Sequence, residues 1–270
     1  LASTGDLGSV NDAYRPFVRR AASFIASYSQ ESGRLIRPSF DLWEERRGTF
    51  SFTQASCVGA LCAASVIAAA LGQEDDSRRF LSSALSLLHG LVETLSTDKL
   101  GFCRSPGDWT CDSSLFLIPL LLPEPGTLPP EEARLLSEAM RRARTTWARL
   151  RSSLAVSLPG VKAPGFARYT GDWYFRPGNA GDLPGNAWPV ATAWYVMSGM
   201  KLGELGRGDL ALYLQWFDDV SDRGGHLPEQ FDCVGGQPLS VSPLAWSHAM
   251  HLDLLSLSRR GNTPPREGAE

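Results

Sequence analysis

The sequence is poor in the features that mark metal sites and disulfide frameworks. Its five cysteines include no CxxC pair, which argues against a zinc site and against a dense disulfide framework. Cys103 and Cys111 bracket the loop "CRSPGDWTC" and could form one bridge, so the compartment stays open. His248 and His251 lie three residues apart without an HExxH block, which favours core or surface histidines over a metal pair. The sequence therefore predicts no metal site.

Runs of one charge and long hydrophobic runs are also scarce. The net charge is −3 with both signs interspersed, so the electrostatic footprint of a nucleic-acid binder is missing and a weakly charged partner is favoured. The apolar stretch at 58–72 is too short and too rich in alanine for a transmembrane span, and it predicts a buried helix. The opening "LASTGDLGS" lacks the pattern of a signal peptide and begins with Leu1 instead of methionine. We therefore expect a piece of a longer product, either cytoplasmic or secreted.

Alternating strand patterns are scarce as well, whereas apolar residues recur at helical spacing through most of the chain. In residues 75–97, for example, Phe80, Ala84, Leu88 and Leu91 fall on one stripe. With 270 residues and 43% hydrophobic content, the chain can bury a large core. The sequence predicts an all-α protein. The expected helices are 10–30, 52–72, 75–97, 113–122, 130–153, 187–205, 208–221 and 242–259.

The connections between these helices differ in length and composition. Four long loops, at 31–50, 98–112, 154–186 and 222–241, hold tryptophans, tyrosines, charged residues and many glycines and prolines. The loops near 73–74 and 206–207 are very short. Long loops in a compact domain are usually functional, so we expect the long ones to gather at one end of paired helices.

Aromatic and polar residues are concentrated in "YTGDWYFRPGNAGDLPGNAW" at 169–188. Aromatic faces stack on sugar rings while Arg, Asp and Asn bond hydroxyls, although the same set suits a nucleobase, a peptide or a loop that packs its own aromatics. The residues concerned are Tyr169, Trp173, Tyr174, Phe175 and Trp188, with Arg168, Arg176, Asp172 and Asp182.

Two further loops carry carboxylates. Glu229 lies in "GGHLPEQFD", and adjacent glutamates follow an aspartate and a tryptophan in "FDLWEERRGTF" at 40–50. A lone loop glutamate is more often solvated or a helix cap than catalytic. Two carboxylates on separate loops at one end of a helical assembly, however, are what glycoside hydrolysis requires, one as acid and one as base or nucleophile.

Four sequence blocks together resemble glycoside hydrolase family 15, the glucoamylase and glucodextranase family. They are "DLWEERRGTFSFTQA", "RYTGDWY", "GNAW" and "LPEQFDCVGGQPLSVSPLAWSHA", in the family's order and approximate spacing from about residue 12 to 258. The resemblance implies an (α/α)6 barrel of twelve helices. Because eight helices are expected here, beginning with what resembles the fifth, the barrel would be incomplete and an N-terminal remainder is expected in the parent protein.

The resemblance also implies roles for individual residues. Glu44 matches the general acid and Glu229 the general base, and the family inverts configuration, so we expect the two carboxyl groups about 6.5–9.5 Å apart. The remaining matches would bind substrate or shape the pocket. They are Asp41, Trp43, Glu45, Arg168, Trp188 and Trp246, to which the aromatic and polar loop adds Tyr169 and Asp172.

The implied activity is an inverting, exo-acting α-glucosidase that releases terminal glucose from α-glucans or α-linked oligosaccharides without a cofactor. A trehalase-like activity within the family and an inactive carbohydrate-binding or regulatory relative remain as alternatives. Another (α/α)6 enzyme, such as a polysaccharide lyase, is disfavoured because lyases do not need two glutamate blocks. This chain alone is expected to be inactive if the first part of the barrel is required.

The sequence departs from the family pattern in several places. The early block whose arginine and aspartate grip the terminal glucose is missing, "GNAW" replaces "GNPW", and "PLAWSHA" replaces "DLTWSYA". His226, just before Glu229, is a further candidate for polarising the site. We expect one partial catalytic domain over 1–259 and a disordered tail over 260–270.

Overall fold

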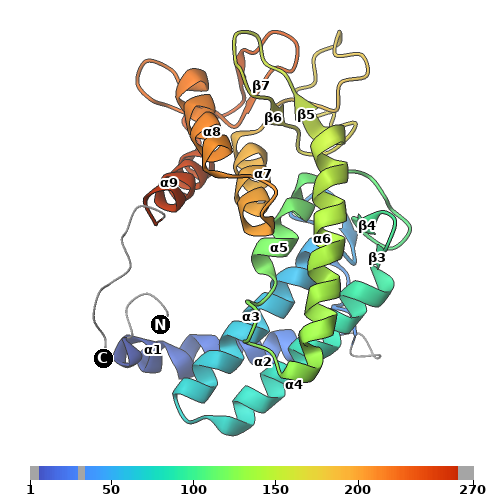
Figure 1. Ribbon diagram of the computed structural model, residues 1–270, viewed down its shortest axis with the longest axis vertical. Coiled ribbons are helices and arrows are strands. Elements are labelled where there is room, and N and C mark those ends of the chain that lie inside the picture. The colour runs from blue at the N-terminus through green and yellow to red at the C-terminus, as the bar shows by residue number, and fades with distance from the viewer. Residues whose placement is uncertain (1–5, 30–33, 261–270) are drawn as a thin grey trace. The chain divides into compact units, whose positions relative to one another are not determined.

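The computed structural model describes residues 6–29 and 34–260, and most of that chain is helical (Figure 1). Every expected helix is present, which confirms the all-α class. The first expected helix is divided by a π-helical segment around Pro16, which has no amide hydrogen to donate. The α-helices are α1 (Leu7–Ala13), α2 (Arg19–Ser27), α3 (Ser51–Ala70), α4 (Glu74–Thr94), α5 (Ile118–Leu121), α6 (Ala133–Leu154), α7 (Pro189–Leu202), α8 (Arg207–Val220) and α9 (Ala245–Arg260), joined by η1 (Tyr14–Val18), η2 (Ser113–Leu117) and η3 (Pro130–Glu132).

The long connections contain antiparallel two-stranded hairpins that the sequence did not predict. Each strand has only two residues, too short for an alternating pattern to show. The pairs are β1 (Ser39–Phe40) with β2 (Arg47–Gly48), β3 (Ser96–Thr97) with β4 (Gly101–Phe102), β5 (Ala155–Val156) with β6 (Gly165–Phe166), and β7 (Gln230–Phe231) with β8 (Pro238–Leu239).

The chain forms two compact units. Unit 1 comprises the residues up to Trp109 together with Leu117–Thr146, and unit 2 comprises Thr110–Phe116 together with the residues from Trp147 onward. The expectation of one catalytic domain over 1–259 stays a prediction. Helix α9 continues to Arg260, and the rest of the expected tail lies outside the described residues.

Unit 1 is built on α3 and α4, which lie side by side (Figure 1). The predicted stripe of α4 is buried at Phe80, Ala84, Leu88 and Leu91. Among the described residues, α3 is the one helix long and apolar enough to cross a membrane by length and composition. The core helix of a soluble protein passes the same test, and α3 also packs against α2 and α5.

A buried glutamine ties this helix pair to the segment that leads into β1. The Gln54 amide donates to the carbonyl oxygens of Arg34 and Leu87 at 2.8 and 2.9 Å, and its own oxygen accepts from the Ile36 amide at 3.0 Å. Its side chain is fully buried, so these bonds also satisfy backbone groups that water does not reach. Gln54 thereby fixes the chain just before the first carboxylate loop.

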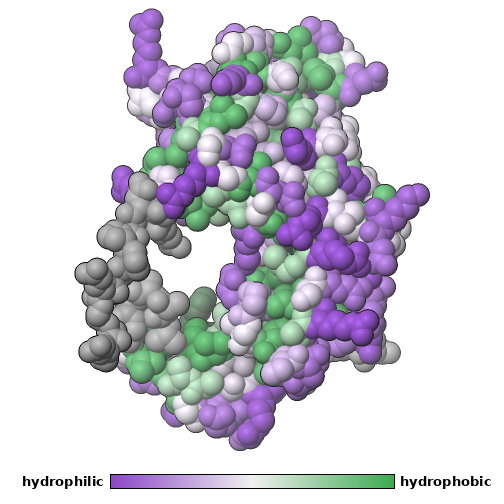
Figure 2. All heavy atoms as spheres, in the orientation of Figure 1, coloured by the Kyte–Doolittle hydropathy of each residue, from purple (hydrophilic) through white to green (hydrophobic). Residues whose placement is uncertain are grey.

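Unit 2 packs α8 and α9 against α7, which is buried on nearly all sides (Figure 1). Its core holds a group of aromatic rings around Tyr195, which stacks on Phe166 at 4.0 Å and on Trp147 at 4.9 Å between ring centroids. Apolar side chains also reach the surface of the molecule (Figure 2). In unit 1, Phe17 and Phe24 are exposed to solvent.

The close packing around α4 yields a stability prediction. A Cβ built at Gly90 would overlap the carbonyl oxygen of Arg34, which is backbone and cannot rotate away. We expect Gly90→Ala to lower the free energy of unfolding by about 1–3 kcal/mol. Gly208, on α8, has no atom within 4 Å of the added Cβ, so Gly208→Ala should leave stability unchanged or raise it by up to about 1 kcal/mol. Urea unfolding followed by circular dichroism compares the two variants, and equal midpoints would contradict the packing argument.

Candidate active site

The first carboxylate loop is the tight turn of the β1–β2 hairpin in unit 1, where Phe40 pairs with Arg47. The Asp41 amide donates to the Arg46 carbonyl at 2.8 Å, and the Asp41 carboxylate accepts from the amides of Glu45 and Arg46 at 2.9 and 3.3 Å. Aspartate side chains commonly hold turns in this way. The structure therefore places Asp41, which is buried, as the residue that fixes the turn.

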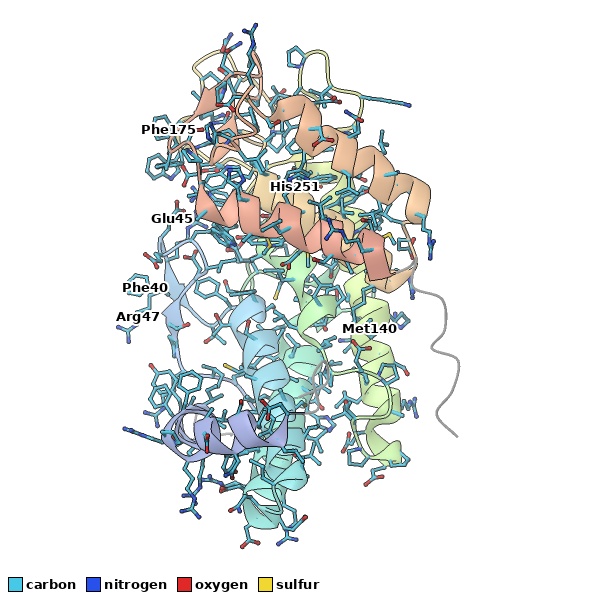
Figure 3. All side chains as sticks on the ribbon, turned by 90° about the vertical axis from the view of Figure 1, so that its left-hand side faces the viewer. Phe40, Glu45, Arg47, Met140, Phe175 and His251 are labelled. Carbon is cyan, nitrogen blue, oxygen red and sulfur yellow. The ribbon has the colours of Figure 1, made fainter. Side chains whose placement is uncertain are left out.

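Glu44 occupies the strained position of this turn. Its φ of 59° lies in the left-handed region, which costs a residue with a side chain roughly 1–3 kcal/mol. Its amide donates to the Asp41 carbonyl at 3.1 Å. The side chains of Glu44 and Glu45 are exposed, Trp43 is half-buried, and Phe40 and Arg47 project outward from the same hairpin (Figure 3). The turn thus holds Glu44 in one backbone conformation and leaves its side chain exposed to solvent.

A buried ion pair organises the loop after β6 in unit 2. Arg168 donates from Nε to one oxygen of Asp172 at 2.9 Å and from Nη2 to the other at 2.7 Å. Asp172 is fully buried and also accepts from the Tyr174 amide at 3.1 Å. Such bidentate pairs fix the plane of the guanidinium group. The structure brings Arg168 and Asp172 together as partners of each other.

Aromatic rings surround the same guanidinium group. Its carbon lies 4.8 Å from the ring centre of Tyr169, 5.1 Å from that of Trp188 and 5.4 Å from that of Tyr174. Positive charge over aromatic faces is favourable, more so where water is excluded. Four predicted residues, Arg168, Tyr169, Asp172 and Trp188, therefore form one cluster, and Tyr174 joins them.

Asn186 connects this cluster to the second carboxylate loop. Its amide donates to the Gln230 side-chain oxygen at 2.8 Å, and its own oxygen accepts from the Cys233 amide at 3.1 Å. Ala187 and Phe231 exchange backbone bonds beside it at 2.8 and 3.0 Å. Asn186 and Gln230 lie within the blocks that resemble the family, but the sequence predicted no role for either residue. Their place inside these blocks was the signal available in the sequence.

Glu229 sits on a loop that the start of α9 holds in place. The Leu227 amide donates to Nε2 of His248 at 3.1 Å, and the Ser247 hydroxyl donates to the Pro228 carbonyl at 2.8 Å. The Glu229 amide donates to the Val241 carbonyl at 2.9 Å. Within the described part of the chain, Oε2 of Glu229 is buried and has no hydrogen-bond partner. A buried carboxylate oxygen without a donor is costly, and a bound hydroxyl or water would satisfy it.

Three further residues considered in the sequence analysis, Trp246, His226 and His251, also belong to unit 2. Trp246 packs against Trp194 of α7, with 5.4 Å between ring centroids. His226 pairs with Asp222 at 3.0 Å, and hydrogen bonds from the backbone and ring of His226 hold the pKa of Asp222 below its usual range. His251 stacks on Phe217 at 4.8 Å, and burial lowers the pKa of His251.

Cysteines and possible metal ligands add no further site. All five cysteines are free thiols, so the possible bridge between Cys103 and Cys111 is not formed. The Cys103 thiol contacts the Leu95 carbonyl, and Arg149 donates to the sulfur of Cys111. Across residues 6–29 and 34–260, no three His, Cys, Asp or Glu side chains come together in a way that could hold a metal ion.

The contact between His248 and Leu227 yields a prediction for the mobility of the Glu229 loop. His248→Phe keeps the ring shape but removes the acceptor for the Leu227 amide. We expect amides around 227–231 to exchange with deuterium roughly three to ten times faster, because one hydrogen bond is lost. His251→Phe is the matched control, since His251 stacks on Phe217 in unit 2 and Phe can do the same. Unchanged exchange in His248→Phe, measured by mass spectrometry, would show that this bond does not hold the loop.

Comparison with known proteins identifies the family. The profile described as glycosyl hydrolases family 15 matches residues 3–209, a span that includes Glu44 and Arg168 and ends before Glu229. An uncharacterized glycosyl hydrolase of Methanocaldococcus jannaschii is 28% identical in an alignment 258 positions long, and the match covers 88% of this chain and 37% of that protein. A bacterial glucoamylase complexed with acarbose superposes with a TM-score of 0.68 at 22% identity, over 92% of this chain and 38% of the other. Glucoamylase from Saccharomycopsis fibuligera gives a TM-score of 0.66 at 18% identity, over 93% and 62%.

The structural matches show that the chain has the fold of part of a glucoamylase, which agrees with the incomplete (α/α)6 barrel that the family resemblance implied. The chain spans less than two thirds of the length of each of these relatives. The family profile covers well over half of the chain, from residue 3 to residue 209. On that match, the chain belongs to glycosyl hydrolase family 15.

Proposed function

We propose that this chain is part of the catalytic domain of an inverting, exo-acting α-glucosidase that releases terminal glucose from α-glucans or α-linked glucooligosaccharides. The observation that carries the proposal is the Glu229 carboxylate, whose Oε2 is buried on a loop held by α9 and lacks a partner among the described residues. A general base needs an oxygen that can accept a proton, and this oxygen accepts no hydrogen bond from the described residues.

Glu44 is the proposed general acid. It would give its proton to the glycosidic oxygen as the leaving sugar departs, while Glu229 takes a proton from the water that attacks the anomeric carbon from the opposite face. The strained turn supports this role, because backbone strain at a residue with a side chain concentrates at functional positions. Glu44 belongs to unit 1 and Glu229 to unit 2. The mechanism requires their carboxyl groups about 6.5–9.5 Å apart, so that a water fits beside the sugar.

The cluster around Arg168 is the proposed binding site for the terminal sugar. Asp172 holds the guanidinium plane, and the buried rings of Tyr169 and Trp188 pack over the guanidinium and fix its position. The hydrogen bond between Asn186 and Gln230 connects this cluster to the Glu229 loop. The proposed sugar-binding site and the proposed general base would therefore be held in a fixed position relative to each other. Trp43, Glu45 and Trp246 are proposed substrate contacts on the strength of the family resemblance, and Asp41 contributes by holding the turn of Glu44.

The substrate is proposed to be a neutral α-linked glucose chain, with no metal or cofactor in the reaction. Both structural neighbours described above are named glucoamylases, which supports α-glucans over other sugars. Maltose, isomaltose, dextran and trehalose, assayed side by side, separate a glucoamylase-like from a trehalase-like specificity. Sugar binding without turnover in the longest native product would favour an inactive, carbohydrate-binding relative.

Substitution of the two carboxylates tests the mechanism. In the longest native product that contains this chain, Glu44→Gln and Glu229→Gln should each reduce kcat by roughly a hundredfold or more, because each removes an acid or base while keeping the side-chain shape. Glu131→Gln, at an exposed glutamate of η3, should retain full activity. Glucose release and urea unfolding are measured on the same preparations. Full turnover in either catalytic variant would remove that residue from the mechanism.

A further inference from the structure

A buried aspartate lies in a short segment of unit 2 to which the proposed reaction gives no role. Asp112 is 1% exposed, although aspartate is almost never fully buried unless it is paired. It belongs to the segment Thr110–Phe116, which packs with unit 2 while the sequence on both sides of it belongs to unit 1. A carboxylate that is taken out of water is costly, so its position needs an explanation.

The segment around Asp112 pairs with the backbone that carries the Arg168 cluster. Asp112 lies opposite Tyr169 in an antiparallel bridge. Two backbone hydrogen bonds flank this pair, from the Ser113 amide to the Arg168 carbonyl at 2.8 Å and from the Thr170 amide to the Cys111 carbonyl at 2.9 Å. Residues 168–170 are therefore held by residues 111–113 along their whole length.

The Asp112 side chain fixes the direction in which this segment leaves the pairing. Its Oδ1 accepts from the Ser114 amide at 2.9 Å, and its carbonyl accepts from the Leu115 amide at 3.1 Å. Aspartate side chains cap the starts of helices in this way. The capped segment, η2, then carries Phe116 into the aromatic core, where its ring meets that of Phe166 edge to face at 5.7 Å. Asp112 thereby joins the core of unit 2 to the paired backbone.

The backbone held in this way carries two side chains of the proposed sugar site. Nη2 of Arg168 donates to the Tyr169 hydroxyl at 3.2 Å, and the guanidinium carbon lies 4.8 Å from the centre of the same ring. The ion pair with Asp172 fixes the plane of the guanidinium group, but Asp172 lies on the same loop as Arg168. The pairing with residues 111–113 ties that loop to a separate part of unit 2.

We propose that Asp112 is a positioning residue for the proposed sugar site. By capping η2, it keeps residues 111–113 in register with residues 168–170 and so sets the position of the Arg168 guanidinium group. This inference rests on the proposed function, since it takes the Arg168 cluster as the site of the terminal sugar. Asp112 would govern how tightly the substrate binds and leave the chemical step, which belongs to Glu44 and Glu229, largely unchanged.

The kinetic test uses the longest native product that contains this chain. Asp112→Ala removes the cap and should raise KM for maltose roughly tenfold, because a small displacement of a binding group is costly, while kcat changes by less than about threefold. Asp112→Asn keeps an oxygen that can accept from the Ser114 amide, so its KM should lie within about threefold of the parent value. Asp112→Ser, with a shorter capping side chain, takes the place of the Ala variant if that variant does not fold, and should raise KM in the same direction.

The matched control removes another aspartate cap from the same unit. Asp209, on α8, accepts from the Gly206 amide at 2.8 Å. Asp209→Ala should lower the urea midpoint and leave KM unchanged, which separates a positioning role from a general loss of stability. A KM for Asp112→Ala that equals the parent value, or a loss confined to kcat, would overturn the proposal. Asp112→Asn as impaired as Asp112→Ala would overturn the capping role.

Hydrogen exchange followed by mass spectrometry tests the structural step without any turnover. In Asp112→Ala, peptides that contain residues 168–170 should exchange roughly three to ten times faster than in the parent, whereas Asp209→Ala should leave them unchanged. If the parent hydrolyses none of the glucans but this exchange rises and calorimetry shows weaker maltose binding, the proposed activity fails and the role of Asp112 stands. If the parent is active and Asp112→Ala changes neither the exchange nor KM, the role of Asp112 is refuted and the activity stands.

Discussion

The bidentate ion pair between Arg168 and Asp172 is the interaction on which the loop region of unit 2 depends. Both groups are buried, and the removal of one partner from such a pair typically costs about 3–5 kcal/mol, because a buried charge is left uncompensated. Asp172 also accepts a hydrogen bond from the Tyr174 amide, so the same carboxylate sets the guanidinium plane and the backbone at Tyr174. The loop can therefore be long and irregular and still present fixed side chains.

Buried polar side chains also hold the other loops in place. Gln54 uses three hydrogen bonds to fix the chain that leads into β1, and Asp41 uses two to hold the turn of Glu44. Hydrogen bonds of Asn186 and of side chains at the start of α9 hold the Glu229 loop in the same way. In each case, a buried polar side chain takes the place of regular secondary structure and satisfies backbone groups that a helix or sheet would otherwise pair. Helices supply the frame, and a few buried polar residues determine where the carboxylates lie.

Much of the frame could be predicted from the sequence, because the stripe of α4 and the segments of the other helices repeat at helical spacing. The long loops were also located correctly, since glycine, proline and aromatic residues gather there. The paired residues within the loops could not be predicted in the same way. Asn186 and Gln230 are 44 residues apart along the chain, and only tertiary packing brings them together. The left-handed turn at Glu44 left no glycine as a signal, and the two-residue strands were too short to show a pattern.

The central claim is that Glu44 and Glu229 act as acid and base on a neutral α-glucan with inversion. The most direct measurement is proton NMR of the first glucose released from dextran or soluble starch by the longest native product that contains this chain. An inverting enzyme adds water from the face opposite the departing sugar, so β-glucose should appear first and then convert slowly to the equilibrium mixture. α-Glucose as the first product would contradict the account, because it would require retention and a covalent intermediate.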